Sequence, residues 1–177
     1  MESVNVEVQF YSNTIVRIIR LPDGISLNKK SLSAIKSPET TGLSVSEENN
    51  TIYLKSKDLL VALNLKTGSV TFSEIKGSPL FAEKESGFQF STKKGVDENS
   101  YSVRQAFTLD QDEVIYGLGQ QQNGKLNQRN QKLNLQQANT KVCIRFFQSM
   151  KGVGCFGIVI HRQRSTMIYR RPLLILK

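Results

Sequence analysis

Three acidic side chains could do acid–base chemistry, because they cluster beside a strand-like segment. Asp110, Asp112 and Glu113 lie between the apolar runs AFTL and VIYGLG. Cleavage of a glycosidic bond usually needs two carboxylates a few ångströms apart. This cluster instead lies at a predicted turn between two strands, where carboxylates are normally solvated. We therefore interpret the three as solvated turn residues and predict no catalytic residue in the chain.

The thiols and the single imidazole give no metal or nucleophile motif. Cys143 and Cys155 are twelve residues apart, and Cys143 lies in an apolar run, which favours buried thiols over a disulfide. His161 is the only histidine and the chain has no CxxC pair, so we expect no zinc site. We expect no cofactor either, because the Gly-x-Gly of YGLGQ lacks the third glycine and the helix of a dinucleotide-binding turn. Its glycines, Gly117 and Gly119, predict a bent strand or a close backbone approach.

Glutamines and asparagines crowd residues 116 to 140, which we call the amide-rich segment. Composition alone favours a polar, poorly ordered loop. The stretch KLNLQQ, however, recovers the alternation of a strand through Leu133 and Leu135. Amides carry both hydrogen-bond donors and acceptors, which suits sugar hydroxyls. At this point a loop and a sugar-binding surface are both open.

The elements that must position these residues are strands. Alternating apolar residues and short polar turns predict strands over residues 4–10, 14–20, 51–56, 59–65, 70–75, 87–92, 101–109, 114–119, 132–137, 142–149 and 153–160. Gly68 suits a tight turn between two of them. The polar stretch 26–50 carries no predicted element, and no amphipathic helix is present. Strands without intervening helices predict an all-β, antiparallel β-sandwich.

Length and composition predict one soluble domain. The chain has 177 residues, 38% of them hydrophobic and 22% charged. No window of about 18 apolar residues is present, so we expect no membrane partner. The beginning, MESVNVEVQF, lacks the basic cluster and apolar run of a signal peptide, which predicts a cytoplasmic protein if Met1 is the true start.

The net charge of +9 would ordinarily suggest nucleic acid. Five positive charges, however, lie after residue 160 with no acid beside them: Arg162, Arg164, Arg170, Arg171 and Lys177. Without these five, 19 basic residues stand against 15 acidic ones, a net charge of +4. We therefore predict no nucleic-acid partner.

A motif string in the second half resembles a known family. EVIYGLGQQQNGKLNQRNQKLNLQQANT followed by FFQSMKGVG, residues 113 to 154, is similar to the end of the N-terminal β-sandwich of glycoside hydrolase family 31, the α-glucosidases and α-xylosidases. Two departures stand out: Arg145 replaces the usual proline and Val153 the usual tyrosine. A buried Arg145 would need a partner for its charge.

The resemblance implies a galactose-mutarotase-like supersandwich that precedes a catalytic barrel. It implies a retaining parent enzyme, with both catalytic carboxylates beyond residue 177, so we expect this chain alone to be inactive. In that family a loop of the N-terminal domain reaches the barrel mouth. The matching residues here are Gln136, Gln137, Asn139 and Thr140, which we predict to contact an α-linked oligosaccharide.

The resemblance ends at Cys155, and a shift of the reading frame at this codon would explain why. If the last base of the Cys155 codon is read with the first two bases of the next codon, and reading continues in that register, the codons permit the family-like string FWDSYSPTTFNDDIPTTSFD. We therefore predict two parts, a β-sandwich domain over residues 1–156 and an out-of-frame basic tail over 157–177.

Two further expectations stay open. The alternative function is a stand-alone carbohydrate-binding or interaction β-sandwich module, which exposed aromatics on one sheet face would favour. The small number of tyrosines and the lack of tryptophan argue against it. A final strand left unpaired would also expose an edge through which the domain self-associates.

Overall fold

The computed structural model describes residues 4–27, 34–39, 42–92, 101–135, 137–139, 141–158, 165–170 and 173–176. Its elements are all strands and its described residues contain no helix, in agreement with the predicted all-β class. No described segment forms a helix that could cross a membrane. The chain divides into two compact units, Met1–Pro79 and Leu80–Lys177.

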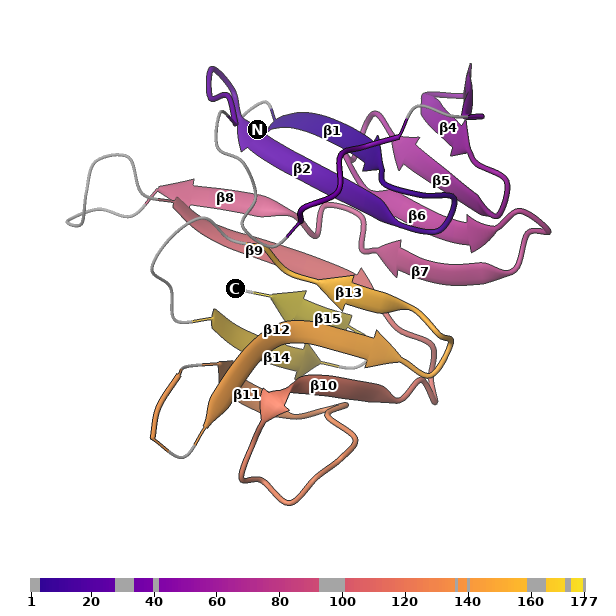
Figure 1. Cartoon of the computed structure of the whole chain (residues 1–177). Helices are drawn as coiled ribbons and strands as arrows, with labels where there is room; N and C mark the ends of the chain where they lie inside the picture. The colour runs from indigo at the N-terminus through magenta and orange to yellow at the C-terminus, as the bar shows by residue number, and fades with distance from the viewer. Residues whose placement is uncertain are drawn as a thin grey trace. The chain divides into compact units, whose positions relative to one another are not determined.

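The first unit contains a hairpin and a meander (Figure 1). Strand β1 (Val4–Phe10) pairs antiparallel with β2 (Val16–Pro22), with Val8 opposite Ile18. Strands β3 (Ser44–Glu48), β4 (Thr51–Lys55), β5 (Leu59–Asn64) and β6 (Val70–Glu74) pair in sequence order. Val61 and Val70 are fully buried, because alternation brings every second residue of these strands to the core.

Turn chemistry between β5 and β6 follows the sequence prediction. Gly68 has a φ of 67°, in the left-handed region that glycine adopts without steric cost. The Asn64 Oδ1 atom accepts hydrogen bonds from the backbone N–H groups of Lys66 and Thr67, at 2.9 and 3.0 Å. This asparagine turn sets the register of the two strands.

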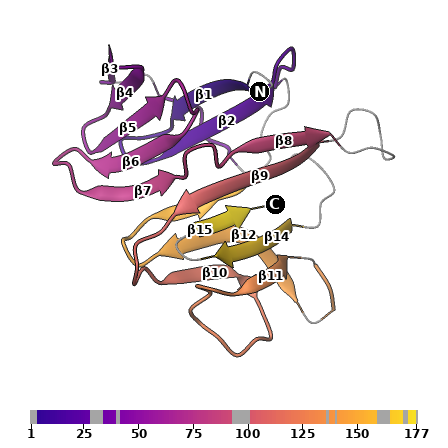
Figure 2. The same ribbon diagram turned by 180° about the vertical axis from the view of Figure 1, so that it is seen from behind.

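The second unit is built from two antiparallel sheets. One has the order β11 (Lys132–Leu135), β14 (Ser165–Arg170), β15 (Leu173–Leu176), β9 (Tyr101–Thr108), β7 (Pro79–Glu83), and β8 (Gln89–Thr92) also pairs with β9. The other has the order β10 (Ile115–Gln120), β12 (Val142–Ser149), β13 (Gly154–Phe156). Figure 2 shows β15 beside β9 and β14, as their registers require.

Three phenylalanines join the two sheets of this unit. The ring of Phe81 on β7 lies 4.7 Å from that of Phe107 on β9 and 5.9 Å from that of Phe147 on β12, measured between centroids. Phe107 and Phe147 are 6.2 Å apart and meet edge to face. Aromatic contacts across two facing sheets make this unit a β-sandwich.

Four strands lie outside the predicted set. Strand β3 falls in the polar stretch 26–50, and each of its five residues is exposed, so it carries no alternation of polarity. Strand β7 begins with Pro79 and was not predicted either. Strands β14 and β15 lie in the predicted tail, and β15 pairs with β14 on one side and β9 on the other. The expected exposed edge concerns β13, the final strand of the predicted 1–156 domain, which among the described strands pairs with β12; self-association through it stays a prediction.

Candidate substrate-contact site

The glycines of YGLGQ allow β10 to pass very close to β12. A Cβ atom on Gly117 would lie 2.6 Å from the carbonyl oxygen of Phe146, and one on Gly119 would lie 2.1 Å from that of Val142. Both residues have positive φ, 104° and 84°. The register shifts between them, which marks a β-bulge. The predicted bend and close backbone approach are confirmed.

The bulge turns Leu118 into the core. Leu118 is fully buried with a φ of 69°, an uncommon conformation for a residue with a side chain. Its burial offsets the backbone strain, since a fully buried leucine contributes about 1.5 to 3 kcal/mol. The bulge thus anchors the start of the amide-rich segment.

Most described amides between residues 121 and 131 bond to their own segment. Gln128 is buried, and its Nε2 donates to the Lys125 carbonyl while its Oε1 accepts from Asn123 Nδ2 at 3.0 Å. The Asn127 Oδ1 atom accepts from the Arg129 N–H at 2.9 Å, and Gln121 Nε2 donates to the Leu118 carbonyl at 3.1 Å. These side chains act as turn formers, so the loop is neither a linker nor a surface of free amides.

Glu113 corrects the interpretation of the acidic cluster, because it is buried, with an exposed fraction of 3%. Its Oε1 accepts a short hydrogen bond from the Ser149 hydroxyl, and its Oε2 accepts one from the Asp110 N–H at 2.9 Å. Lys151 Nζ lies 3.8 Å from the same Oε2. A buried carboxylate is retained only when hydrogen-bonded or paired, which is the case here. Asp110 and Asp112 are exposed, as predicted.

This carboxylate holds three chain segments together. Ser149 ends β12, Asp110 begins the turn before β10, and Lys151 follows β12 and also pairs with Asp110 at 2.6 Å. Arg129 Nη1 donates to the backbone carbonyl of Glu113 at 2.7 Å, which ties in the amide-rich segment. All oxygens of Glu113 are thus engaged in structural contacts, so it is not placed as an acid or base.

The predicted sugar contacts fall on the turn between β11 and β12, which we call the rim loop (residues 136–140). Ala138 and Lys141 form an isolated antiparallel bridge, with two backbone hydrogen bonds of 3.2 Å. Asn139 lies at the tip of the turn and Gln137 beside its base, and both are exposed. Gln136 and Thr140 lie outside the described residues.

The side chain of Gln137 is already oriented by the backbone. Its Oε1 accepts a hydrogen bond from the Cys143 N–H at 3.1 Å. The acceptor end is therefore engaged, and the Nε2 amide is the donor left for a ligand. Arg145, the residue found in place of the family's proline, is half-buried, so its charge is not sealed in the core.

Both cysteines are free thiols rather than a disulfide, as predicted, but each is half-buried instead of buried. Cys155 pairs with Phe147 in the β12–β13 register, whereas Cys143 is four residues before Phe147 on β12. At about 3.4 Å per residue the two are roughly 14 Å apart, far beyond the ~7 Å limit for a disulfide. Burial, with a smaller contribution from the Glu83 carboxylate, raises the pKa of the Cys155 thiol from 9.0 to about 12.

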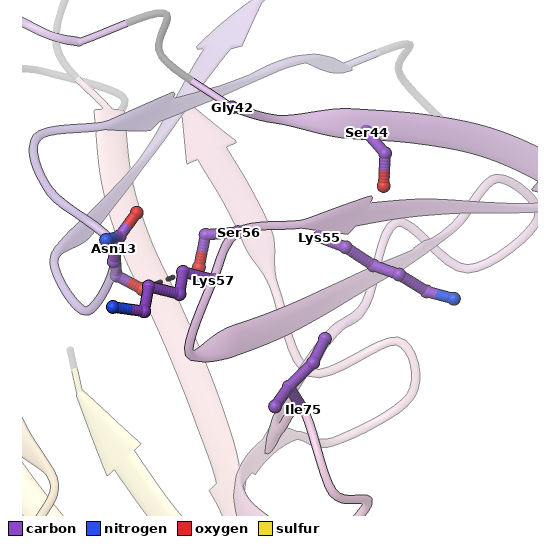
Figure 3. Close-up of a pocket in the computed structure, with 7 residues that line it drawn as sticks. All are labelled: Asn13, Gly42, Ser44, Lys55, Ser56, Lys57 and Ile75. Carbon is purple, nitrogen blue, oxygen red and sulfur yellow. Dashed lines mark hydrogen bonds between the residues drawn. The ribbon is translucent and has the colours of Figure 1, made fainter.

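The first unit has an open cavity of about 510 Å³ at the start of its meander (Figure 3). Ser56 fixes one wall, since its hydroxyl donates to the Asn13 carbonyl at 2.6 Å. The cavity shares no residue with the rim loop, and no carboxylate lines it among the described residues. It is lined by Asn13, Gly42, Ser44, Lys55, Ser56, Lys57 and Ile75.

Within the described residues no group of three histidine, cysteine, aspartate or glutamate side chains could hold a metal ion. The described residues of the rim loop offer hydrogen-bonding amides, which suit contact with a polar ligand.

Most of this chain has counterparts in known proteins. Residues 5–141 match the model of the glycosyl hydrolase 31 N-terminal galactose mutarotase-like domain. The chain is 29% identical over 164 residues to an α-xylosidase of Saccharolobus solfataricus, covering 86% of this chain and 22% of that protein. It thus spans about a fifth of the curated relative's length.

Solved structures give the same result. An α-xylosidase of glycoside hydrolase family 31 from Xanthomonas citri superposes with a TM-score of 0.78 at 29% identity, covering 84% of this chain and 16% of that one. An α-xylosidase from a soil metagenome, complexed with xylose, shares the fold with a TM-score of 0.77 at 18% identity, over 99% of this chain and 29% of that one. A dextranase of Flavobacterium johnsoniae shares the fold with a TM-score of 0.71 at 22% identity, covering 98% of this chain and 24% of that one.

Proposed function

Because this chain belongs to the glycosyl hydrolase 31 N-terminal galactose mutarotase-like domain family, we propose that it supports the substrate site of an α-glycosidase. The parent enzyme would hydrolyse α-glucosides or α-xylosides with carboxylates of a catalytic barrel. The observation that carries the proposal is the family match, which extends through the rim loop to residue 141. The 177 residues cover 16% to 29% of the solved relatives named above.

The rim loop would contribute hydrogen bonds to the sugar. Asn139 presents both a donor and an acceptor from the exposed tip of the turn, and Gln137 presents its Nε2 amide. The Ala138–Lys141 bridge and the Gln137–Cys143 hydrogen bond support this proposal, because they fix the positions of Ala138 and Gln137 before a sugar binds. Gln136 and Thr140 belong to the same proposed contact set.

The proposal predicts no hydrolysis by the chain alone and a gain of activity when the catalytic portion is supplied. The probe is the Saccharolobus solfataricus α-xylosidase with its matching 164-residue segment removed. Mixed with the 177-residue chain, it should cleave 4-nitrophenyl α-xyloside or α-glucoside, while neither part does so separately. Turnover by the purified chain alone would overturn the expected inactivity.

A pair of matched variants tests the rim loop itself. Asn139→Ala should raise KM about tenfold in the mixture, since one lost hydrogen bond to a sugar is worth roughly 1 to 1.5 kcal/mol. Asn134→Ala removes another exposed amide, on β11, and should leave KM unchanged. Equal KM values for the two variants would exclude Asn139 from the contact.

A further inference from the structure

Three asparagines of the described chain hold their side chains in the same kind of turn. Asn64, Asn123 and Asn127 each accept, at Oδ1, a hydrogen bond from the backbone N–H group two residues further on, at 2.9, 3.1 and 2.9 Å. A donor at this oxygen stabilises the negative charge that develops there when a nucleophile attacks the side-chain carbonyl carbon, Cγ. All three asparagines are therefore activated toward attack in the same way.

The nucleophile within reach of each asparagine is the backbone nitrogen of the next residue, whose attack on Cγ closes a five-membered ring. In two of the three turns this nitrogen is engaged. The Leu65 N–H donates to the Asn50 carbonyl and the Gln128 N–H donates to the Ile115 carbonyl, both at 2.8 Å. In the remaining turn, the Gly124 N–H has no hydrogen-bond partner among the described residues. Of the three turns, this one alone leaves the nitrogen free.

Access to the Gly124 nitrogen is also open. Asn123 is the only asparagine of the sequence that a glycine follows, so no side chain shields this nitrogen. Gly124 is exposed, and no atom lies within 4 Å of the position that a Cβ atom would occupy. No acidic residue occurs after Glu113, and the nearest charged residues along the chain are Lys125 and Arg129. Positive charge favours the deprotonated nitrogen and the oxygen anion that its attack creates.

We propose that Asn123 is a modification site, at which the folded chain deamidates with water as the only co-reactant. The Gly124 nitrogen gives its proton to solvent and bonds to Cγ of Asn123. The Cγ–Nδ2 bond then breaks, and the side-chain nitrogen takes up a proton and leaves as ammonia. Water opens the resulting cyclic imide. Cleavage of the Cγ–N bond leaves an aspartate, whereas cleavage of the bond between the nitrogen and the main-chain carbonyl carbon leaves an isoaspartate, whose main chain runs through Cγ.

The side chain of Gln128 links this modification to the order of the amide-rich segment. Gln128 is buried, and its Oε1 accepts from Asn123 Nδ2 at 3.0 Å while its Nε2 donates to the Lys125 carbonyl. A carboxylate has no donor, so the product sets a second acceptor against Oε1. Turning the Gln128 amide over would instead set Oε1 against the Lys125 carbonyl. The buried Oε1 thus loses its donor, which we expect to loosen the hydrogen bond between the Gln128 N–H and Ile115 on β10.

Peptide mapping by mass spectrometry tests the site on the 177-residue chain incubated in neutral buffer, with folding followed by circular dichroism. We expect deamidation at Asn123 to be at least about tenfold faster than at Asn64 and Asn127. The product should contain isoaspartate, which an aspartate-specific endoproteinase leaves uncut. Gly124→Ala should slow the reaction at least about tenfold, because its methyl group shields the nitrogen. Gly152→Ala, which alters another exposed glycine with open space around its Cβ position, should leave the rate unchanged.

Hydrogen exchange tests the expected effect on the segment. In Asn123→Asp the Gln128 N–H should exchange at least about fivefold faster than in the unmodified chain. Asn127→Asp is the matched control, because Asn127 accepts at Oδ1 from two backbone N–H groups, a role that a carboxylate keeps. Equal exchange rates in the two variants would overturn the loosening of the segment.

Two results of the mapping would overturn the site itself. One is an intact Asn123 in the folded chain under conditions where the chain unfolded in urea deamidates at this residue. The other is aspartate without isoaspartate, which would mean direct hydrolysis of the side chain rather than attack by the Gly124 nitrogen. Neither result bears on the proposed function, because the mixture contains no sugar and no catalytic portion.

Discussion

Gly119 shows how one residue without a side chain fixes the geometry of the site. Its backbone passes so close to β12 that the nearest atom to a Cβ would be a carbonyl oxygen, which cannot move aside as a flexible side chain could. The bulge that it forms with Gly117 turns Leu118 inward and starts the amide-rich segment. The spacing of glycines in YGLGQ is therefore a steric requirement of the β10–β12 contact.

We expect Gly119→Ala to destabilise the domain by more than 3 kcal/mol, because both the positive φ and the 2.1 Å contact oppose a Cβ atom. Gly124→Ala is the matched control, since Gly124 has a φ of 65° with no atom within 4 Å of its Cβ position. That variant should lose only about 1 kcal/mol. Urea unfolding of both variants measures the difference, and equal losses would contradict the close approach.

Glu113→Ala should lower the free energy of unfolding by about 3 kcal/mol, because the Ser149 hydroxyl and the Asp110 N–H would lose their buried acceptor. Asp112→Ala changes a neighbouring exposed carboxylate and should have an effect below ~0.5 kcal/mol. A double-mutant cycle with Ser149→Ala should show a coupling energy of about 1 kcal/mol or more. Additive losses would mean that the two side chains do not interact.

The raised pKa of the Cys155 thiol predicts that the free energy of unfolding depends on pH in the alkaline range. The thiol pKa is raised to about 12 in the folded chain, so between pH 9 and pH 12 the unfolded chain loses this proton while the folded chain keeps it. Stability should therefore fall across this window by roughly 1.4 kcal/mol per pH unit from this residue alone. Cys155→Ala should remove that part of the slope in urea titrations at pH 9, 10 and 11. An unchanged slope would mean that the thiol is not desolvated.

At the scale of elements, β12 carries one side chain of the core and, next to it, one that is exposed. Phe147 closes the aromatic cluster between the two sheets, whereas its neighbour Phe146 is 40% exposed. The two residues share a strand and a chemistry but not an environment, because successive side chains of a strand point to opposite faces.

Phe147→Ala should cost about 3 to 5 kcal/mol, since it opens a cavity between Phe81 and Phe107. Phe146→Ala in the isolated chain should cost less than ~1 kcal/mol, because that ring is 40% exposed. Thermal unfolding of both variants provides the comparison. A large loss for Phe146→Ala would place its ring in a core rather than on an outer face.

At the scale of the whole molecule, the main prediction is that residues 157–177 are translated out of frame. Backbone hydrogen bonds pair β14 and β15 with their neighbours, and such bonds are formed by any sequence without proline at the bonded positions, so the pairing does not test the reading frame. The frameshift stays a prediction, as does the boundary at residue 156.

Sequencing the DNA of codons 150 to 177 tests the predicted frameshift. We expect the register that begins in the Cys155 codon to remain open and to read FWDSYS onward. A stop codon or a sequence unlike that string in the shifted register would end the idea. Heparin retention gives a protein-level comparison, since replacing Arg162, Arg164, Arg170 and Arg171 by glutamine should abolish any retention if the tail alone causes it.

The sequence alone determined the class of fold and the family, because strand alternation and the order of residues in the YGLGQ to KGVG string are local properties. Strand β12 was predicted with its observed bounds for this reason. Strand β3 was missed because an exposed edge strand has no buried side to impose alternation.

Only the tertiary structure decided which polar residues are buried. Glu113 was interpreted as a solvated turn residue because nothing in its neighbours along the chain reveals Ser149 and Lys151, which lie 36 and 38 residues away. Most amides of residues 121–131 likewise bond within the amide-rich segment, whereas Gln137 and Asn139 are exposed on the rim loop. Burial is a property of contacts between distant segments, so the composition that made this segment look like a linker could not reveal its order.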